Sequence, residues 1–468
     1  MNLLFKRTPL AAGILLALSS PVFSPKVIAA QGDPVLDEFP VNSTTLNSQQ
    51  DSSIAMDADG DFVIAWQSKS NDTTWDVYAQ RYSADGIEAG TEFLVNSKTS
   101  DNQDSPSIAM DADGDFVITW TSKGQVDPGY EVYAQRYTAD GIKAGIEFQV
   151  NSHTDGEQRN SSIAMDADGD FVIAWQSTGQ DDPEDIFLTF FGIYAQRYTA
   201  DGIEVGAEFP VNSYTADDQT DPSIAMDADG DFVIAWQSYE QDGDLNGIYA
   251  QRYTADGNTT GIEFRVNTET PGRQSYPSIA MDADGDFVIA WQSYGRDTSD
   301  SYGVYAQRYS ADGSPAGTEF PINTTTDFDQ LAPSIAMGAD GDFVIAWQSK
   351  GQDNPPAPDY GVYAQRYSAN GTQAGTEDLL VNYTVTHEHQ RRPSIAMDAD
   401  GDLVIAWSSF GQVPDNSSNG IFAQRYKGAS QTVDLNLVVQ DDVDPVAAGG
   451  RLFIRSLPPT TAQEPRWT

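Results

Sequence analysis

One phrase, SIAMDADGDFVIAW, recurs seven times along the chain with little change. The copies are 54 to 61 residues apart, and a period of this length is typical of propellers and solenoid arrays. Each copy is followed by a variable polar stretch, then by VYAQRYSADG or a near copy, then by EFPVN or a near copy. The chain therefore contains seven similar units, whose methionines are Met56, Met110, Met165, Met226, Met281, Met337 and Met397.

Each unit predicts four short strands, which we name A (SIAM), B (FVIAW), C (VYAQRY) and D (EFPVN), because β-branched and aromatic residues dominate all four phrases. Asp-Gly pairs between A and B and between C and D predict tight hairpin turns. Strand B is apolar on both faces, so it needs a packing neighbour on either side, which a propeller provides. The predicted fold class is all-β: a seven-bladed β-propeller of four-stranded antiparallel blades.

The two ends of the array complement each other. The last unit ends its strand C at Tyr426 and has no EFPVN phrase after it. An unaccompanied copy of that phrase, residues 38–42, stands before the first unit instead. We therefore predict that the N-terminal strand completes the last blade and closes the ring, leaving no free edge between the first and last blades.

The N-terminal segment predicts export. Lys6 and Arg7 precede an apolar run over residues 10–18, and the small residues Ala29 and Ala30 follow, which is the layout of a secretory signal. We predict a signal peptide over residues 1–30 and a secreted or cell-surface protein with no transmembrane segment in the mature chain. The alternative is an uncleaved N-terminal anchor.

The propeller is predicted over residues 31–427, and a different segment follows over residues 428–468. Residues 433–454 read VDLNLVVQDDVDPVAAGGRLFI and resemble the opening strands of immunoglobulin-like repeat domains of bacterial surface proteins. The remaining chain is far too short for such a domain of about 100 residues. We expect a poorly ordered tail, and our hypothesis is a truncated or frameshifted reading frame.

The charge of the chain restricts its partners. It has 25 Lys and Arg against 70 Asp and Glu, a formal net charge of −45. Such a surface repels phosphate backbones, so nucleic acid is not an expected partner, and we expect an extracellular protein or a glycan. We also expect a monomer. The chain has no cysteine, which excludes disulfides and thiolate metal sites.

Carboxylates alternate around a glycine in every A-to-B turn, as in Asp57-Ala58-Asp59-Gly60-Asp61. Oxygen ligands of this kind suit hard cations such as Ca²⁺. The pattern resembles the first half of the calcium loops in FG-GAP repeats of integrin-type propellers, although Phe62 and Ala65 stand where that family continues with glycine and aspartate. The alternative is a hairpin whose Asp and Gly serve only the backbone. The resemblance implies Ca²⁺ as a cofactor and these metal ligands: Asp57, Asp59, Asp61, Asp111, Asp113, Asp115, Asp166, Asp168, Asp170, Asp227, Asp229, Asp231, Asp282, Asp284, Asp286, Asp340, Asp342, Asp398, Asp400 and Asp402.

Other repeated residues are assigned to structure. The tryptophan that ends each strand B, first Trp66, is predicted to pack between blades rather than to form a sugar platform. The arginine of each strand C, first Arg81, is expected to pair with carboxylates. His387-Glu388-His389 is interpreted as an exposed loop rather than a metal site.

The two faces of the predicted ring differ. The B-to-C and D-to-A connections vary from unit to unit and share one face, which we call the variable face; the repeated Asp-Gly turns occupy the other. Variable loops on a constant frame are typical of recognition. We predict a non-enzymatic extracellular binding or structural module, adhesin-like or scaffold-like, with no catalytic or other cofactor-binding residues. The alternative is a glycan-active hydrolase or lyase using the variable face, which would gather acids and arginines in one pocket there.

Overall fold

The computed structural model describes residues 34–428, except residues 36, 45–46, 70–72, 126–128, 182–189, 299, 353–358, 383–387 and 412–417. The predicted signal segment and the immunoglobulin-like tail lie outside these residues. Contacts along the chain divide it into two units, Met1–Ser430 and Gln431–Thr468, and only the first contains described residues. Within the described ranges there is no helix, so no helix long and apolar enough to cross a membrane is found there.

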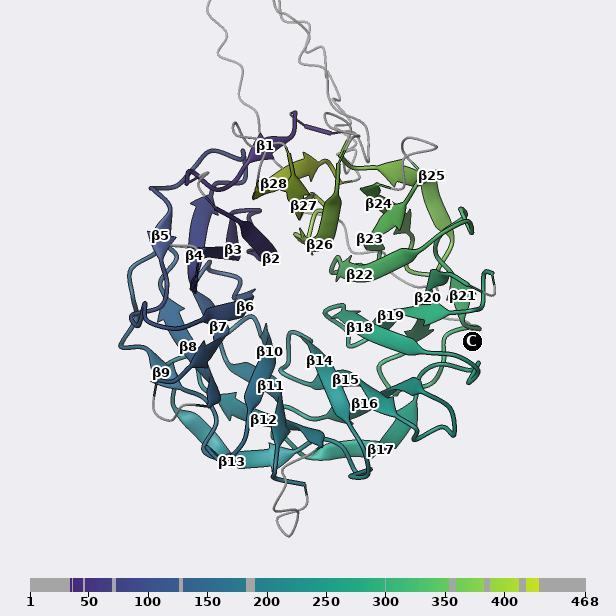
Figure 1. Cartoon of the computed structure of the whole chain (residues 1–468), viewed down its shortest axis with the longest axis horizontal. Helices are drawn as coiled ribbons and strands as arrows, with labels where there is room; N and C mark the ends of the chain where they lie inside the picture. The colour runs from purple at the N-terminus through teal and green to yellow at the C-terminus, as the bar shows by residue number, and fades with distance from the viewer. Residues whose placement is uncertain are drawn as a thin grey trace, which may run out of the picture. The chain divides into compact units, whose positions relative to one another are not determined.

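The described chain forms seven antiparallel sheets of four strands, arranged as blades around an axis (Figure 1). This confirms the all-β seven-bladed propeller. The A strands are β2 (Gln49–Met56), β6 (Gln103–Met110), β10 (Gln158–Met165), β14 (Gln219–Met226), β18 (Gln274–Met281), β22 (Gln330–Met337) and β26 (Gln390–Met397). The B strands are β3 (Phe62–Lys69), β7 (Phe116–Lys123), β11 (Phe171–Thr178), β15 (Phe232–Tyr239), β19 (Phe287–Tyr294), β23 (Phe343–Lys350) and β27 (Leu403–Phe410).

Strands C and D complete each blade toward its outer edge, and the A strands lie innermost (Figure 1). The C strands are β4 (Trp75–Tyr82), β8 (Tyr130–Tyr137), β12 (Phe191–Tyr198), β16 (Asn246–Tyr253), β20 (Tyr302–Tyr309), β24 (Tyr360–Tyr367) and β28 (Asn419–Tyr426). The D strands are β5 (Phe93–Leu94), β9 (Phe148–Gln149), β13 (Glu204–Pro210), β17 (Thr259–Arg265), β21 (Phe320–Pro321), β25 (Gln373–Leu380) and β1 (Phe39–Pro40).

The predicted closure is confirmed, because β1 pairs with β28 in a sheet ordered β1-β28-β27-β26. Phe39 lies opposite Ala423, and the Val41 amide donates to the Ile421 carbonyl at 2.8 Å. The first and last blades also share one buried apolar cluster. The seventh blade is therefore built from both ends of the propeller sequence.

Packing between blades explains the apolar character of strand B on both faces. Each of the seven apolar clusters combines residues of two neighbouring blades. The tryptophans that end the B strands are at most 1% exposed, which confirms their packing role. Removing one such ring costs about 3–5 kcal/mol. They are Trp66, Trp120, Trp175, Trp236, Trp291, Trp347 and Trp407.

The strand C arginines differ from the expectation. Among the described residues no carboxylate accepts a hydrogen bond from them; each guanidinium donates to a backbone carbonyl in a neighbouring blade, as Arg81 Nη1 does to Asp140 at 2.7 Å. That acceptor lies in the next C-to-D turn, which the curvature of the ring brings within reach. The seven arginines therefore clip neighbouring blades together.

Candidate functional site

The predicted metal ligands lie in seven separate A-to-B turns, and two of the three carboxylates in a turn hold the backbone. Asp57 Oδ1 accepts the amides of Asp59 and Asp61 at 3.0 and 2.9 Å. Asp61 Oδ1 accepts the amide of Ala84 at 2.7 Å, which ties the A-to-B turn to the C-to-D turn. Asp59 is exposed at the tip. The first-carboxylate bonds recur at Asp111, Asp166, Asp227, Asp282 and Asp398, and the third-carboxylate bonds recur at Asp115, Asp170, Asp231, Asp286, Asp342 and Asp402.

The glycine of each turn is required by geometry. Gly60 has φ +88°, and a Cβ there would lie 3.0 Å from Asp398 Oδ2 of the neighbouring blade. Burial raises the pKa of the first carboxyl of the turn, for example at Asp57. No group of three or more His, Asp or Glu side chains within the described ranges is arranged to hold a metal ion. Calcium at these turns stays a prediction.

A second repeated feature lies on the axis, where every strand A contains a β-bulge. The pairing of β2 with β3 shifts register between Gln50 and Ser53, and the same shift occurs in the other six blades. The residue at the third position of each strand A has a left-handed backbone, with φ between 51° and 56°. We call these seven residues the bulge ring: Asp51, Ser105, Asn160, Asp221, Tyr276, Ala332 and Arg392.

Each bulge is fastened to the preceding blade. The amide of Ser105 donates to Gln67 Oε1 at 2.9 Å, and the amide of Arg392 donates to Gln348 Oε1 at 2.9 Å. Equivalent bonds to a strand B side chain hold the other five amides at 3.0 to 3.3 Å. The surrounding ring therefore imposes the left-handed conformation at all seven positions.

None of the seven bulge residues is glycine, although glycine adopts this conformation without steric cost. A left-handed L-residue costs roughly 1–2 kcal/mol, and strain of this kind concentrates at functional sites. The side chains also differ from blade to blade, as do those at the preceding position, whereas the Gln that begins each strand A and the SIAM that ends it are constant. The bulge ring therefore places chemically different side chains around the axis, although the backbone conformation repeats in every blade.

The bulge ring surrounds a cavity of about 690 Å³ on the axis, lined by residues from all seven blades. This volume lies within the usual range of ligand sites. Because strand A begins at the D-to-A connection, the cavity belongs to the variable face. A separate cavity of about 210 Å³ lies toward the Asp-Gly turns and is lined by Met, Asp, Ala and one Gly residue.

Two aspartates near the axial cavity have raised pKa values, and of these Asp221 lines the cavity. Asp221 Oδ1 accepts Asn160 Nδ2 at 3.4 Å, and burial raises the pKa of the Asp221 carboxyl. Asp104, one residue before the bulge position in β6, has a pKa raised to about 6 by burial and by the charge of Asp51, against the opposing effect of Arg159. These carboxyls therefore retain protons closer to neutral pH than ordinary aspartates do.

The rest of the ring is different in character. Arg392 forms an ion pair with Asp51 across the junction between the last and first blades. Tyr276 is 54% exposed and offers an aromatic face, and Ala332 follows in the next blade. The axial cavity thus combines carboxyls in unlike environments, an arginine and an aromatic surface.

Sequence reasoning missed this site. It placed every candidate ligand in the turns of the opposite face, and none of those residues lines the axial cavity. The detectable signal was that the second and third residues of each QxxxSIAM phrase vary between a constant Gln and a constant SIAM.

Comparison with known proteins supports the fold. No family model and no curated protein sequence matches the chain. Among solved structures, Kuenenia stuttgartiensis hydrazine synthase aligns with TM-score 0.50 and 10% identity, covering 83% of this chain and 99% of that one. Polysaccharide lyase Uly1 aligns with TM-score 0.47 and 11% identity, covering 82% and 91%. A GH93 alpha-L-arabinofuranosidase of Fusarium graminearum, solved with arabinobiose, aligns with TM-score 0.46 and 11% identity, covering 84% and 98%.

The expectation that the chain is not an enzyme is wrong in its premise. The solved structures reported above include enzymes, one of them aligning with TM-score 0.50, so the architecture does not exclude an enzyme. The axial cavity also holds the acids and the arginine that the alternative required of one pocket on the variable face. At 10–11% identity the likeness shows the fold alone.

Proposed function

We propose that the protein is a glycan-active enzyme, a hydrolase or a lyase, that acts in the axial cavity. The observation that carries this proposal is the pair of aspartates in unlike surroundings: Asp221 is protonated more readily than usual, and Asp51 is paired with Arg392. Two carboxyls whose environments differ in this way can act as an acid and a base in the same reaction.

In a hydrolysis, Asp221 donates its proton to the glycosidic oxygen as the bond to the anomeric carbon breaks. Asp51 accepts a proton from the water that adds to that carbon. The exposed ring of Tyr276 stacks on a sugar face, and Asn160 holds Asp221 in place through its side-chain amide. In a lyase the same acid protonates the leaving oxygen, and a base removes a carbon-bound proton instead of activating water.

The test is a screen of neutral and acidic polysaccharides with the full chain, measuring new reducing ends. Ultraviolet absorbance of an unsaturated product distinguishes elimination from hydrolysis. Asp221→Asn should lower the rate at least about 100-fold, as expected for loss of a general acid. Asp256→Asn, the same change at an exposed turn of the same blade on the opposite face, is the control. Equal rates for both variants would refute the assignment of Asp221.

Two further properties belong to this proposal. Export by the N-terminal segment would place the enzyme where extracellular glycans are found. Calcium at the FG-GAP-like turns would stabilise the face opposite the axial cavity, since the exposed carboxylates at the turn tips repel one another.

A further inference from the structure

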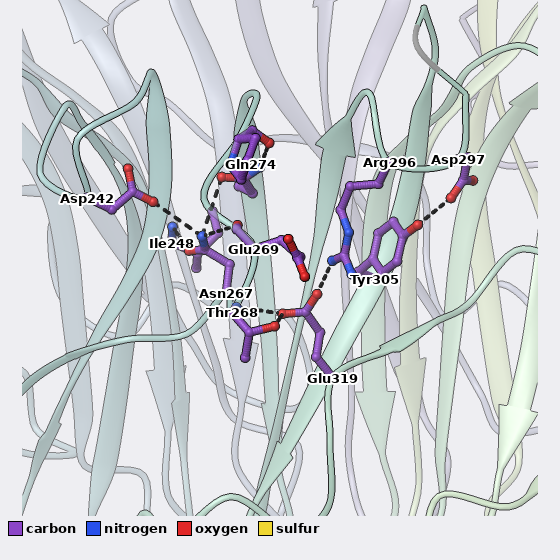
Figure 2. A network of polar contacts seen from close by, with 11 residues as sticks. Asp242, Ile248, Asn267, Thr268, Glu269, Gln274, Arg296, Asp297, Tyr305 and Glu319 are labelled. Atoms are coloured by element: carbon purple, nitrogen blue, oxygen red, sulfur yellow. Dashed lines mark hydrogen bonds and ion pairs between the residues drawn. The ribbon is translucent and has the colours of Figure 1, made fainter.

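A second cavity lies in the side wall of the ring, between the fourth and fifth blades. It has a volume of about 1010 Å³ and is lined by the end of β17, the loop after β19 and the chain between β20 and β21. Figure 2 shows the polar contacts around it, including those of Asp242, Asn267, Arg296 and Glu319. This wall cavity is separate from the axial cavity and shares no residue with it.

One contact beside the wall cavity, which we call the clamp, recurs in other blades: a glutamate accepts hydrogen bonds from a residue of the preceding blade. Glu319 Oε2 accepts the amide and the hydroxyl of Thr268 at 2.7 and 2.8 Å, which links the two blades. The matching carboxylates Glu147, Glu208 and Glu263 accept the same pair of bonds from a serine of the preceding blade.

Blade five differs from these blades in the side chain that completes the clamp. In three other blades a neutral glutamine donates to the carboxylate: Gln125, Gln180 and Gln241, at 2.5 to 2.6 Å. In blade five Arg296 takes this place and forms an ion pair with Glu319. Since glutamine satisfies the same carboxylate elsewhere, the clamp does not require the positive charge of Arg296.

A second arginine is found only at this wall. Arg265 ends β17 opposite Tyr249, and the residues at the same register in the other blades are Pro, Leu or Gln. Arg265 is exposed, and the Arg296 side chain is 22% exposed with its guanidinium stacked 3.8 Å above the ring of Tyr305. Two departures from the repeat thus bring guanidinium groups to one cavity of a strongly acidic chain.

We propose that the wall cavity binds an acidic saccharide through a uronate carboxylate held by Arg265 and Arg296. Guanidinium groups match the planar geometry of a carboxylate. The side chains of Asn267, Gln241 and Asp242 line the same cavity and supply partners for hydroxyl groups, and Phe264 supplies an apolar surface for a sugar face. The acids around the cavity and the net charge of −45 disfavour dense polyanions such as nucleic acids.

The experiment measures binding of tetragalacturonate and of its fully methyl-esterified form to the full chain by calorimetry. It is performed in the Asp221→Asn background so that the ligand is not consumed. The acidic form should bind at least ten times more tightly than the ester, and Arg265→Gln/Arg296→Gln should remove this difference. Both substitutions copy residues found at the same positions in other blades, Gln149 and Gln241, so the fold should be kept.

The control is Arg273→Gln, which removes an exposed arginine that does not line the wall cavity. It should leave the preference for the acidic form unchanged. Equal affinity for the two ligands, no binding of either, or loss of binding in the Arg273 variant alone would overturn the proposal. Its failure is distinguishable from failure of the proposed function, because binding at the wall does not depend on turnover in the axial cavity.

Discussion

The strain stored in the bulge ring can be measured with a matched pair of substitutions in β22. Ala332 has φ +51°, whereas Ala336 lies four residues further along the same strand with an ordinary strand backbone and is 7% exposed. Ala332→Gly removes a left-handed strain of roughly 1–2 kcal/mol and adds about 0.4–1 kcal/mol of unfolded-state entropy. The expected result is a stabilisation of about 0.5–1 kcal/mol.

Ala336→Gly should have the opposite effect. It adds the same entropy to the unfolded chain, relieves no strain and loses a buried methyl group, so about 1–2 kcal/mol of stability is lost. Calorimetric melting of both variants should show midpoints that differ by roughly 1.5–3 °C, since a fold of this size moves by about 1 °C per kcal/mol. If both variants melt below the parent by the same amount, the bulge ring stores no strain and the argument from strain to function is lost.

Four further outcomes are expected. Tyr276→Gly should raise the melting midpoint slightly for the same backbone reason while raising the KM for a glycan substrate; an unchanged KM would remove Tyr276 from the site. Deleting residues 34–42 removes the strand that pairs with β28, together with the buried side chain of Val41, so about 5 kcal/mol of stability should be lost. A peptide of those residues should restore this stability, and a deletion without effect would contradict the closure. Because burial raises the Asp104 pKa to about 6, the folded state binds this proton more tightly than the unfolded chain, so stability should increase as pH falls from 7 toward 4, and Asp104→Asn should reduce this dependence in melting curves. A calcium chelator should lower the melting midpoint if the Asp-Gly turns hold Ca²⁺, and an unchanged midpoint would leave those turns purely structural.

The architecture was predictable because local signals agreed in every unit. Four apolar phrases, two Asp-Gly turns and a misplaced EFPVN copy are enough to predict blades, their order and their closure. The seven tryptophans were also predictable, because an identical large ring in every unit fits a shared interface better than a unique site.

The site was not predictable for two physical reasons. The β-bulge in strand A cannot be recognised from a glycine in the sequence, because its left-handed position holds Asp, Ser, Asn, Tyr, Ala or Arg. The paired side chains are also distant in the chain, since Asp51 and Arg392 are separated by 341 residues and meet only when the ring closes. The arginine clips were missed for the same reason, because their backbone acceptors are placed by the curvature of the ring.

The most direct test of the central claim is the pH dependence of polysaccharide cleavage by the parent chain and by Asp221→Asn. The account predicts that the parent loses activity as pH rises and Asp221 loses its proton. It also predicts that the variant is at least about 100-fold slower across the whole range while melting like the parent. A variant that cleaves at the parent rate with the same pH profile would show that the axial cavity does not carry the chemistry.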